Sequence, residues 1–114
     1  MFIEPPHIIN ITSDVLINIS ALNNVNLNCS FAGDLTYTTA YWIKGNMNLT
    51  RNTTIMSNNT AVLSLSIDPS EETYLGSYQC VVTNEVGYDS RTTRVLPTGN
   101  THVDIGFIIY IVYI

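Results

Sequence analysis

The feature that most constrains this chain is the placement of its only two cysteines, each within a short segment of alternating apolar and polar residues. In the segment VNLNCSF, Cys29 shares one face with Leu27 and Phe31, and in SYQCVVT, Cys80 shares one face with Tyr78. A period of two residues predicts β-strands that are buried on one side. Both sulfurs are therefore expected inside the protein, either as a structural pair or as two thiols.

Much of the remaining chain has the same short period. VLINIS and AVLSLSI alternate, and TAYWIK and YDSRTTRVL are rich in the residues that favour strands, with turn signals such as Gly45 and Asn46 between the segments. No segment before residue 100 keeps an apolar period of 3.6 residues. The sequence therefore predicts an all-β fold, a two-sheet antiparallel sandwich of about seven to eight strands.

The 114 residues are expected to form a single domain. We place this domain at residues 5–96, with residues 1–4 as a leader remnant or linker and residues 97–104 as a second linker. Residues 105–114, IGFIIYIVYI, form an apolar tail, whereas a spanning helix needs about 20 such residues. Three interpretations of the tail stay open: a truncated transmembrane segment, a stray end from a mis-joined gene model, or an extra strand.

The charge of the chain restricts its partners. Charged residues are 11% of the sequence and the net charge is −5, with only four Lys and Arg residues. Nucleic-acid binding needs a basic surface that neutralises phosphates. The composition therefore argues against nucleic acid, and for the same reason against direct binding to an anionic membrane. Contact with a membrane is expected only through a C-terminal span.

The weakly charged surface is rich in asparagine, serine and threonine, and it carries six Asn-x-Ser/Thr triplets of the kind that accept N-linked glycans. Several such triplets are expected by chance in a chain of this composition, but the excess favours a glycoprotein of the secretory pathway. The segment MFIEPPHIIN has no basic start and no long apolar run, so it does not resemble a signal peptide. We therefore expect a fragment or excised domain of an extracellular protein, either at the cell surface or secreted. The acceptors are Asn10, Asn18, Asn28, Asn48, Asn52 and Asn58.

Two aromatic residues stand at informative distances from the cysteines. Trp42 lies 13 residues after Cys29, and Tyr78 lies two residues before Cys80. This Cys–Trp–Tyr-x-Cys arrangement resembles the immunoglobulin superfamily over roughly residues 5–96. The resemblance implies a disulfide between Cys29 and Cys80, with Trp42 packed against it and Leu65 in the core. It also implies that Tyr78 donates its hydroxyl hydrogen to upstream backbone, at a corner that Gly76 permits.

Finer features point to one branch of that superfamily. The run from Cys80 to Gly87, CVVTNEVG, resembles the I-set pattern, and the short distance from Trp42 to Leu63 leaves no room for the extra strands of a variable-type domain. The segments YWIKGNMNLT, LSLSI, GSYQCVVTNEV and SRTTRVL are most similar to the constant-type domains of the carcinoembryonic-antigen-related adhesion family.

One departure from the family pattern concerns a salt bridge. Tyr74 occupies the position of an aspartate that ordinarily pairs with an arginine, here Arg51, and Glu72 is the available substitute. A partly exposed bridge of this kind contributes about 1 kcal/mol or less. The expected fold does not depend on it.

The sequence offers no set of residues for catalysis or metal binding. The two histidines, His7 and His102, lie in the flanks, and there is no Cys-x-x-Cys pair, whereas a structural zinc site needs four clustered ligands. The adjacent carboxylates Glu71 and Glu72 diverge in a loop, and no glycine-rich phosphate loop is present. The chain is therefore predicted not to be an enzyme and to need no cofactor.

One sheet face is expected to be free for a partner. Because Trp42 and Cys80 point inward, the residues beside them point outward, and five of the six glycan acceptors are expected on the opposite sheet, with Asn48 near the rim. Such an apolar face is typical of a protein-binding surface, although these residues are also ordinary strand formers on a half-exposed sheet. The predicted partner face consists of Tyr41, Ile43, Gln79 and Val81, with Glu85 and Tyr88 at the neighbouring loop.

Taken with the resemblance, these features predict an extracellular immunoglobulin-like module of a cell-surface glycoprotein that acts in adhesion or protein recognition. The partner is expected to be a protein, bound homophilically or heterophilically. Two alternatives stay open, a secreted or virus-encoded decoy and a structural spacer in a larger receptor.

Overall fold

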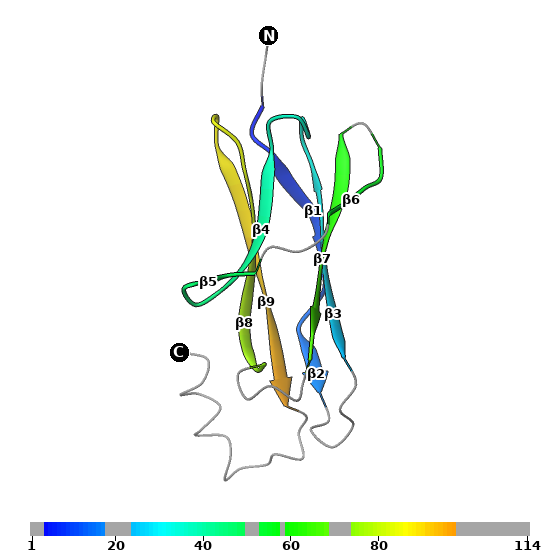
Figure 1. The fold of residues 1–114 in the computed structure, drawn as a ribbon, viewed down its shortest axis with the longest axis vertical. Helices are drawn as coiled ribbons and strands as arrows, with labels where there is room; N and C mark the ends of the chain where they lie inside the picture. The colour runs from blue at the N-terminus through cyan, green and yellow to red at the C-terminus, as the bar shows by residue number, and fades with distance from the viewer. Residues whose placement is uncertain (1–3, 18–23, 50–52, 58, 69–73, 98–114) are drawn as a thin grey trace.

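A computed structural model describes residues 4–17, 24–49, 53–57, 59–68 and 74–97. Within these ranges the chain forms nine β-strands and no helix (Figure 1), so none of them contains a helix able to cross a membrane. The strands are β1 (His7–Ile11), β2 (Val15–Ile17), β3 (Val25–Ala32), β4 (Thr39–Lys44), β5 (Met47–Asn48), β6 (Thr53–Ile55), β7 (Thr60–Ile67), β8 (Gly76–Thr83) and β9 (Tyr88–Pro97).

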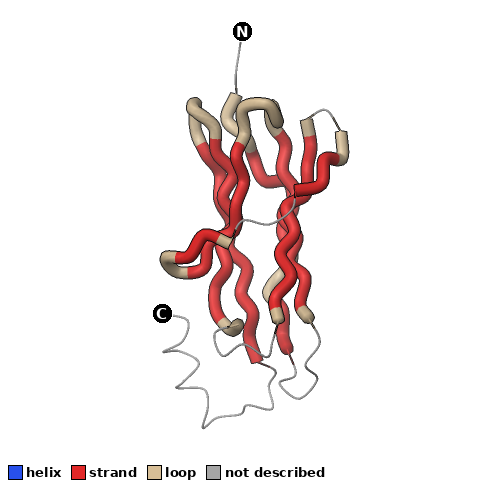
Figure 2. Tube along the Cα trace, in the orientation of Figure 1, coloured by secondary structure: helices blue, strands red, loops and turns tan. Residues whose placement is uncertain are grey.

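The strands form two sheets that face each other, as Figure 2 shows in red. One sheet has four strands in the order β1-β3-β7-β6, and the other has five in the order β2-β9-β8-β4-β5. The predicted all-β, two-sheet sandwich is confirmed. The described strands are more numerous than the seven to eight expected, because the two-residue β5 adds an edge to the five-stranded sheet.

The short strand β2 adds one parallel pairing to the antiparallel sandwich that the sequence predicts. β1 pairs antiparallel with β3, but the chain then crosses to the other sheet, where β2 pairs parallel with β9 through Val15–Val95 and Ile17–Pro97. The other strand pairings are antiparallel. β2 also extends the sheet contacts to Pro97, one residue beyond the predicted domain boundary. The residues after Pro97, including the apolar tail, lie outside the described ranges.

The core forms because each long strand buries every second residue. β3 alternates strictly, with Leu27, Cys29 and Phe31 buried and Asn26 and Asn28 exposed. β7 and β8 turn their own alternate residues toward the same space between the sheets. The alternation seen in the sequence thus becomes the single hydrophobic core of the domain. Its largest fully buried side chains include Trp42, Leu27, Leu63, Leu65, Val82 and Val95.

An ion pair holds the crossover between the sheets. Asp14 accepts the backbone N–H of Arg94 at 2.9 Å, and its other carboxylate oxygen lies 2.7 Å from Arg94 Nη2. The Arg94 side chain first, and its backbone N–H second, hold the pKa of Asp14 below its usual value. A carboxylate with a lowered folded-state pKa stabilises the fold above its unfolded pKa of about 4, and this stabilisation is lost as the pH falls through the folded value.

Replacing Asp14 by Asn, which keeps the acceptor for the backbone N–H, is expected to lower the free energy of unfolding at pH 7. Because both side chains are substantially exposed, the loss should be about 0.5 kcal/mol. The difference from the unsubstituted protein should shrink as the pH falls below about 4. Urea unfolding across a pH series measures it, and Arg94→Gln should remove the same pH dependence. A difference that stays constant with pH contradicts the assigned role.

Hydrogen bonds join the first described residues to the β8–β9 turn and to the start of β9. Asn84 donates its side-chain N–H to Glu4 O at 2.7 Å, and its side-chain oxygen accepts the backbone N–H groups of Val86 and Gly87. Farther along, the backbone N–H of Ile8 donates to Asp89 Oδ2 at 2.7 Å. The start of β1 is therefore fastened to the β8–β9 turn, which fixes the loop beside the predicted partner face.

Candidate protein-binding face

The centre of the sandwich has the arrangement that the spacing of cysteine and tryptophan implied. Cys29 on β3 and Cys80 on β8 form a disulfide with a Cα–Cα distance of 6.5 Å, which joins the two sheets. Trp42 pairs with Cys80 in the sheet, and its indole N–H donates to Leu63 O at 3.3 Å in the opposite sheet. Leu63 is itself the strand partner of Cys29. The sheets are thus joined twice in one place, and the sequence did not reveal the carbonyl acceptor.

The corner before β8 is held by a tyrosine hydroxyl. Tyr78 donates to Tyr74 O at 2.7 Å, and Gly76 between them has a φ of +130°, a conformation that side chains other than glycine rarely adopt. Tyr74 stands where the family has aspartate, and it is 9% exposed and part of the core. Its side chain therefore contributes buried apolar surface in place of a charge. Arg51 and Glu72, the expected ionic partners, lie outside the described residues.

The side chain of Lys44 packs over the ring of Tyr78 at this corner. Lys44 Nζ lies 5.3 Å from the centroid of the Tyr78 ring, within the range of a cation–π contact. Burial lowers the pKa of Lys44. Lys44 therefore places a cationic group over the ring face of the tyrosine at this corner.

The outer surface of the five-stranded sheet carries the predicted partner residues in neighbouring rows. Tyr41 on β4 stands opposite Val81 on β8, Ile43 stands opposite Gln79, and Tyr88 on β9 stands opposite Thr83. Directly opposed residues of antiparallel strands point to the same side. The recognition face is defined here as Tyr41, Ile43, Gln79, Val81 and Tyr88.

The members of the recognition face differ in exposure. Tyr88 is 71% exposed, and Tyr41, Ile43 and Gln79 are half-buried. Gln79 donates its side-chain N–H to Ser90 Oγ at 3.1 Å, which orders the middle of the face. Glu85 is exposed in the adjoining turn. The face therefore offers aromatic and aliphatic groups with a charge only at its border.

Val81 is a correction to the predicted face. It was expected to be an open contact residue, but it is only 9% exposed. Its strand is the centre of the sheet, and Val81 lies between Tyr41 on one side and Ser90 on the other. A small side chain between two neighbours has little open surface. Val81 is thus a largely buried member of the recognition face, and the accessible surface is contributed by Tyr41 and Tyr88.

Asn48 lies on β5, the edge strand of the five-stranded sheet, where the sequence placed it near the rim. On β5 it stands directly opposite Ile43, and it is exposed. A glycan on Asn48 would therefore lie next to Ile43, so the rim position borders the recognition face.

Of the other glycan acceptors, two lie on the four-stranded sheet and three lie outside the described residues. Asn10 and Asn28 are exposed on the outer side of the four-stranded sheet, where the sequence placed them. Asn18, Asn52 and Asn58 lie outside the described residues. β2, which leads to Asn18, belongs to the five-stranded sheet, so the expectation that this strand joins the sheet of Asn28 was wrong.

The described residues contain no free thiol and no cluster of metal ligands. Both cysteines are consumed in the disulfide, so neither sulfur is a thiol nucleophile. In the described part of the chain, no three His, Cys, Asp or Glu side chains gather as metal ligands. The described residues form the recognition face on the five-stranded sheet, next to the β8–β9 turn that Asn84 holds.

Comparison with known proteins agrees with this architecture. A family model described as immunoglobulin domain matches residues 5–84. Among solved structures, a chain of the complex between the Dpr2 Ig1-Ig2 and DIP-Theta Ig1-Ig3 immunoglobulin domains superposes with a TM-score of 0.71 at 20% identity, over 84% of this chain and 33% of that one. Immunoglobulin domains 1–5 of Sidekick-1 give 0.66 at 14% identity, over 85% of this chain and 20% of that one.

A tandem pair of titin immunoglobulin domains gives a TM-score of 0.61 at 24% identity, over 86% of this chain and 49% of that one. No curated protein matches the sequence. The chain thus spans about a third of the first of these solved structures and half of the titin pair. Its family match covers most of its length and coincides with the disulfide, the buried tryptophan and the tyrosine corner. The chain belongs to the immunoglobulin domain family.

Proposed function

We propose that this chain is an extracellular immunoglobulin-like module of a cell-surface glycoprotein, and that it binds a protein partner through the recognition face. The observation that carries the proposal is that half-buried Tyr41 and Ile43 lie on the same ordered, nearly uncharged side of the sheet as exposed Tyr88. Aromatic residues are enriched and charged residues depleted at the centres of protein interfaces. The domain acts by contact alone and performs no catalysis.

The adhesion role has two further supports. The sequence resembles the I-set and the carcinoembryonic-antigen-related adhesion domains, and the abundance of N-glycan acceptors suits an extracellular surface. Immunoglobulin domains of similar fold occur in protein complexes, such as Dpr2 with DIP-Theta and titin with obscurin-like 1. We infer that the partner is another cell-surface protein, a second copy of this chain included.

Substituting Tyr41 and Tyr88 separately by Asp is expected to weaken partner binding about tenfold or more, because aromatic anchors contribute most of the energy of an interface. The multimerised domain is tested against a panel of cell-surface ectodomains, and self-association is measured by sedimentation equilibrium. Val81 is unsuitable for this test, since its substitution would disturb the sheet itself.

The matched control is Ile55→Asp, an exposed apolar residue on β6 of the other sheet, which should leave binding unchanged. Thr50→Ala, which removes the glycan acceptor at Asn48, should strengthen binding or leave it unchanged. Binding that is insensitive to Tyr41 and Tyr88 contradicts the assigned face. A domain that binds no ectodomain and does not self-associate favours the alternative of a structural spacer.

A further inference from the structure

Two of the glycan acceptor triplets lie side by side on the outer face of the four-stranded sheet. The triplet Asn10-Ile11-Thr12 is on and just after β1, and Asn28-Cys29-Ser30 is on β3, with Asn10 opposite Ser30 and Ile11 opposite Cys29. Thr12 joins the two triplets through two hydrogen bonds. Its hydroxyl oxygen accepts the backbone N–H of Asn28 at 2.8 Å, and its backbone N–H donates to Asn28 O at 3.0 Å. Each acceptor asparagine therefore lies beside the other triplet.

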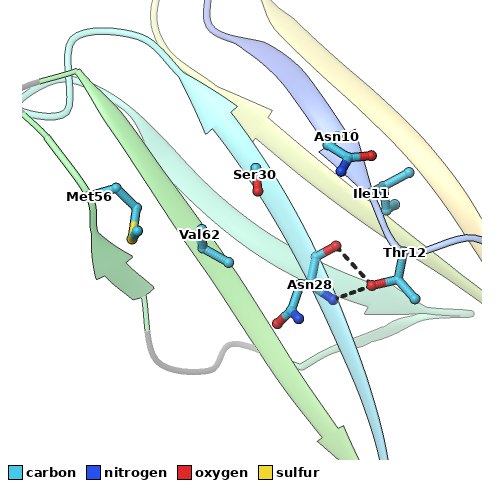
Figure 3. A pocket seen from close by; sticks show the side chains of 7 residues that line it. All are labelled: Asn10, Ile11, Thr12, Asn28, Ser30, Met56 and Val62. Atoms are coloured by element: carbon cyan, nitrogen blue, oxygen red, sulfur yellow. Dashed lines mark hydrogen bonds between the residues drawn. The ribbon is translucent and has the colours of Figure 1, made fainter.

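These residues line an open groove of about 490 Å³, a volume within the range of small-molecule sites. Figure 3 shows the polar residues of β1 and β3 at one side and Met56 and Val62 at the other. Asn10, Ser30 and Val62 form one row across three strands, and the small Ser30 lies between the two larger residues. The β1–β7 groove is defined here as Asn10, Thr12, Asn28, Ser30, Met56 and Val62.

The two asparagines of the groove differ in how their amides are held. Ser64 Oγ donates to Asn28 Oδ1 at 2.7 Å, so the planar amide of Asn28 is fixed against β7. The exposed amide of Asn10 is engaged by no other described residue. Asn10 is therefore the acceptor whose side chain is free to direct a covalent substituent across the groove, over Ser30.

The opposite wall suits one particular occupant. Met56 is 65% exposed, and an exposed methionine beside Val62 provides an apolar surface that is polarizable and adaptable. The first sugar of an N-linked glycan, N-acetylglucosamine, has an apolar ring face and an acetamide methyl group, together with polar groups that can bond to Ser30 and Asn28. The geometry points to Asn10 as the carrier of an N-linked glycan whose first N-acetylglucosamine lies in the β1–β7 groove against Met56 and Val62.

This inference rests on the extracellular placement given under the proposed function, but not on the recognition face. The glycan covers apolar surface on the four-stranded sheet. It therefore stabilises the domain and prevents other protein molecules from binding to that face. The five-stranded sheet remains the face for the protein partner.

The test uses the full chain secreted from a mammalian host and trimmed enzymatically to one N-acetylglucosamine per occupied site, with occupancy read from glycopeptide masses. Loss of the sugar through Asn10→Gln is expected to lower the unfolding midpoint by about 3 °C. In the background of Met56→Ser, an exposed site that should tolerate the change, Asn10→Gln should have almost no effect. With labelled Met56, a nuclear Overhauser effect is expected between its methyl group and the sugar acetamide methyl.

Asn48→Gln is the matched control, because it removes an acceptor outside the groove. It should shift the unfolding midpoint by the same amount in the unsubstituted protein and in the Met56→Ser variant. An effect of Asn10→Gln that is the same in both backgrounds, or no Overhauser effect, overturns the groove inference alone. So does an unmodified Asn10 in a protein glycosylated elsewhere. A secreted protein with no glycan at any acceptor overturns the extracellular placement as well, and partner binding is then tested separately on the unglycosylated chain.

Discussion

Replacing the disulfide by Cys29→Val together with Cys80→Ala is expected to lower the free energy of unfolding by about 4 kcal/mol. The bond joins residues 51 positions apart, and cross-linking a loop of this size removes much of the conformational freedom of the unfolded chain. Valine is larger than cysteine and alanine is smaller, so together they keep the approximate volume of the sulfur pair, and the loss should reflect the cross-link more than a cavity. Urea unfolding of the oxidised protein and of the variant measures the difference.

Reduction provides the matched control for this prediction. Addition of dithiothreitol should lower the stability of the unsubstituted protein to nearly that of the variant and leave the variant unchanged. A typical domain has a stability of about 5–15 kcal/mol, so a folded fraction should remain. A variant as stable as the oxidised protein would show that the two sheets hold together without the cross-link.

Replacing Trp42 by Ala is expected to cost about 3–5 kcal/mol. Trp42 is the largest fully buried side chain, and its indole N–H donates across the sandwich to Leu63 O. The substitution removes apolar contacts on both sheets and leaves a cavity beside the disulfide. Because Trp42 is the only tryptophan, unfolding has to be followed by circular dichroism instead of tryptophan fluorescence.

Trp42→Phe separates the two contributions of the side chain. It keeps most of the apolar volume and removes the hydrogen bond, so its cost should be well below that of Trp42→Ala. If both substitutions cost the same, the bond to Leu63 and not the buried volume is the main contribution of Trp42.

The core was predictable because it depends on local alternation, and the disulfide was predictable because the resemblance to the immunoglobulin superfamily implied it. Once Cys29, Tyr78 and Cys80 occupy inward positions of their strands, the period of two assigns every neighbour to a side, and the observed burial of β3, β7 and β8 follows it closely. The same local rule correctly placed Asn28 outside. It could not identify the acceptors of hydrogen bonds that cross the core, such as Leu63 O.

Alternation failed where exposure depends on neighbours in other strands. Val81 points outward as predicted, yet the central position of β8 buries it. Thr93 lies in the polar run SRTTR, but it is 1% exposed opposite Tyr78, and its hydroxyl finds no partner in the described part of the chain. A residue's side of a strand is local information, whereas its burial depends on what the adjacent strands place beside it.

The sequence by itself determined the class of fold, the inward set of residues and the identity of the two bonded cysteines, since each follows from spacing along one strand or from a family pattern. Only the tertiary structure decided that β2 joins the sheet of β9, that Asn48 stands beside Ile43, and that Asn10 and Asn28 share a groove. The physical reason is register. Which residues of distant strands stand opposite one another is decided when the two sheets pack, and the composition of a recognition face or a glycan groove depends on that pairing.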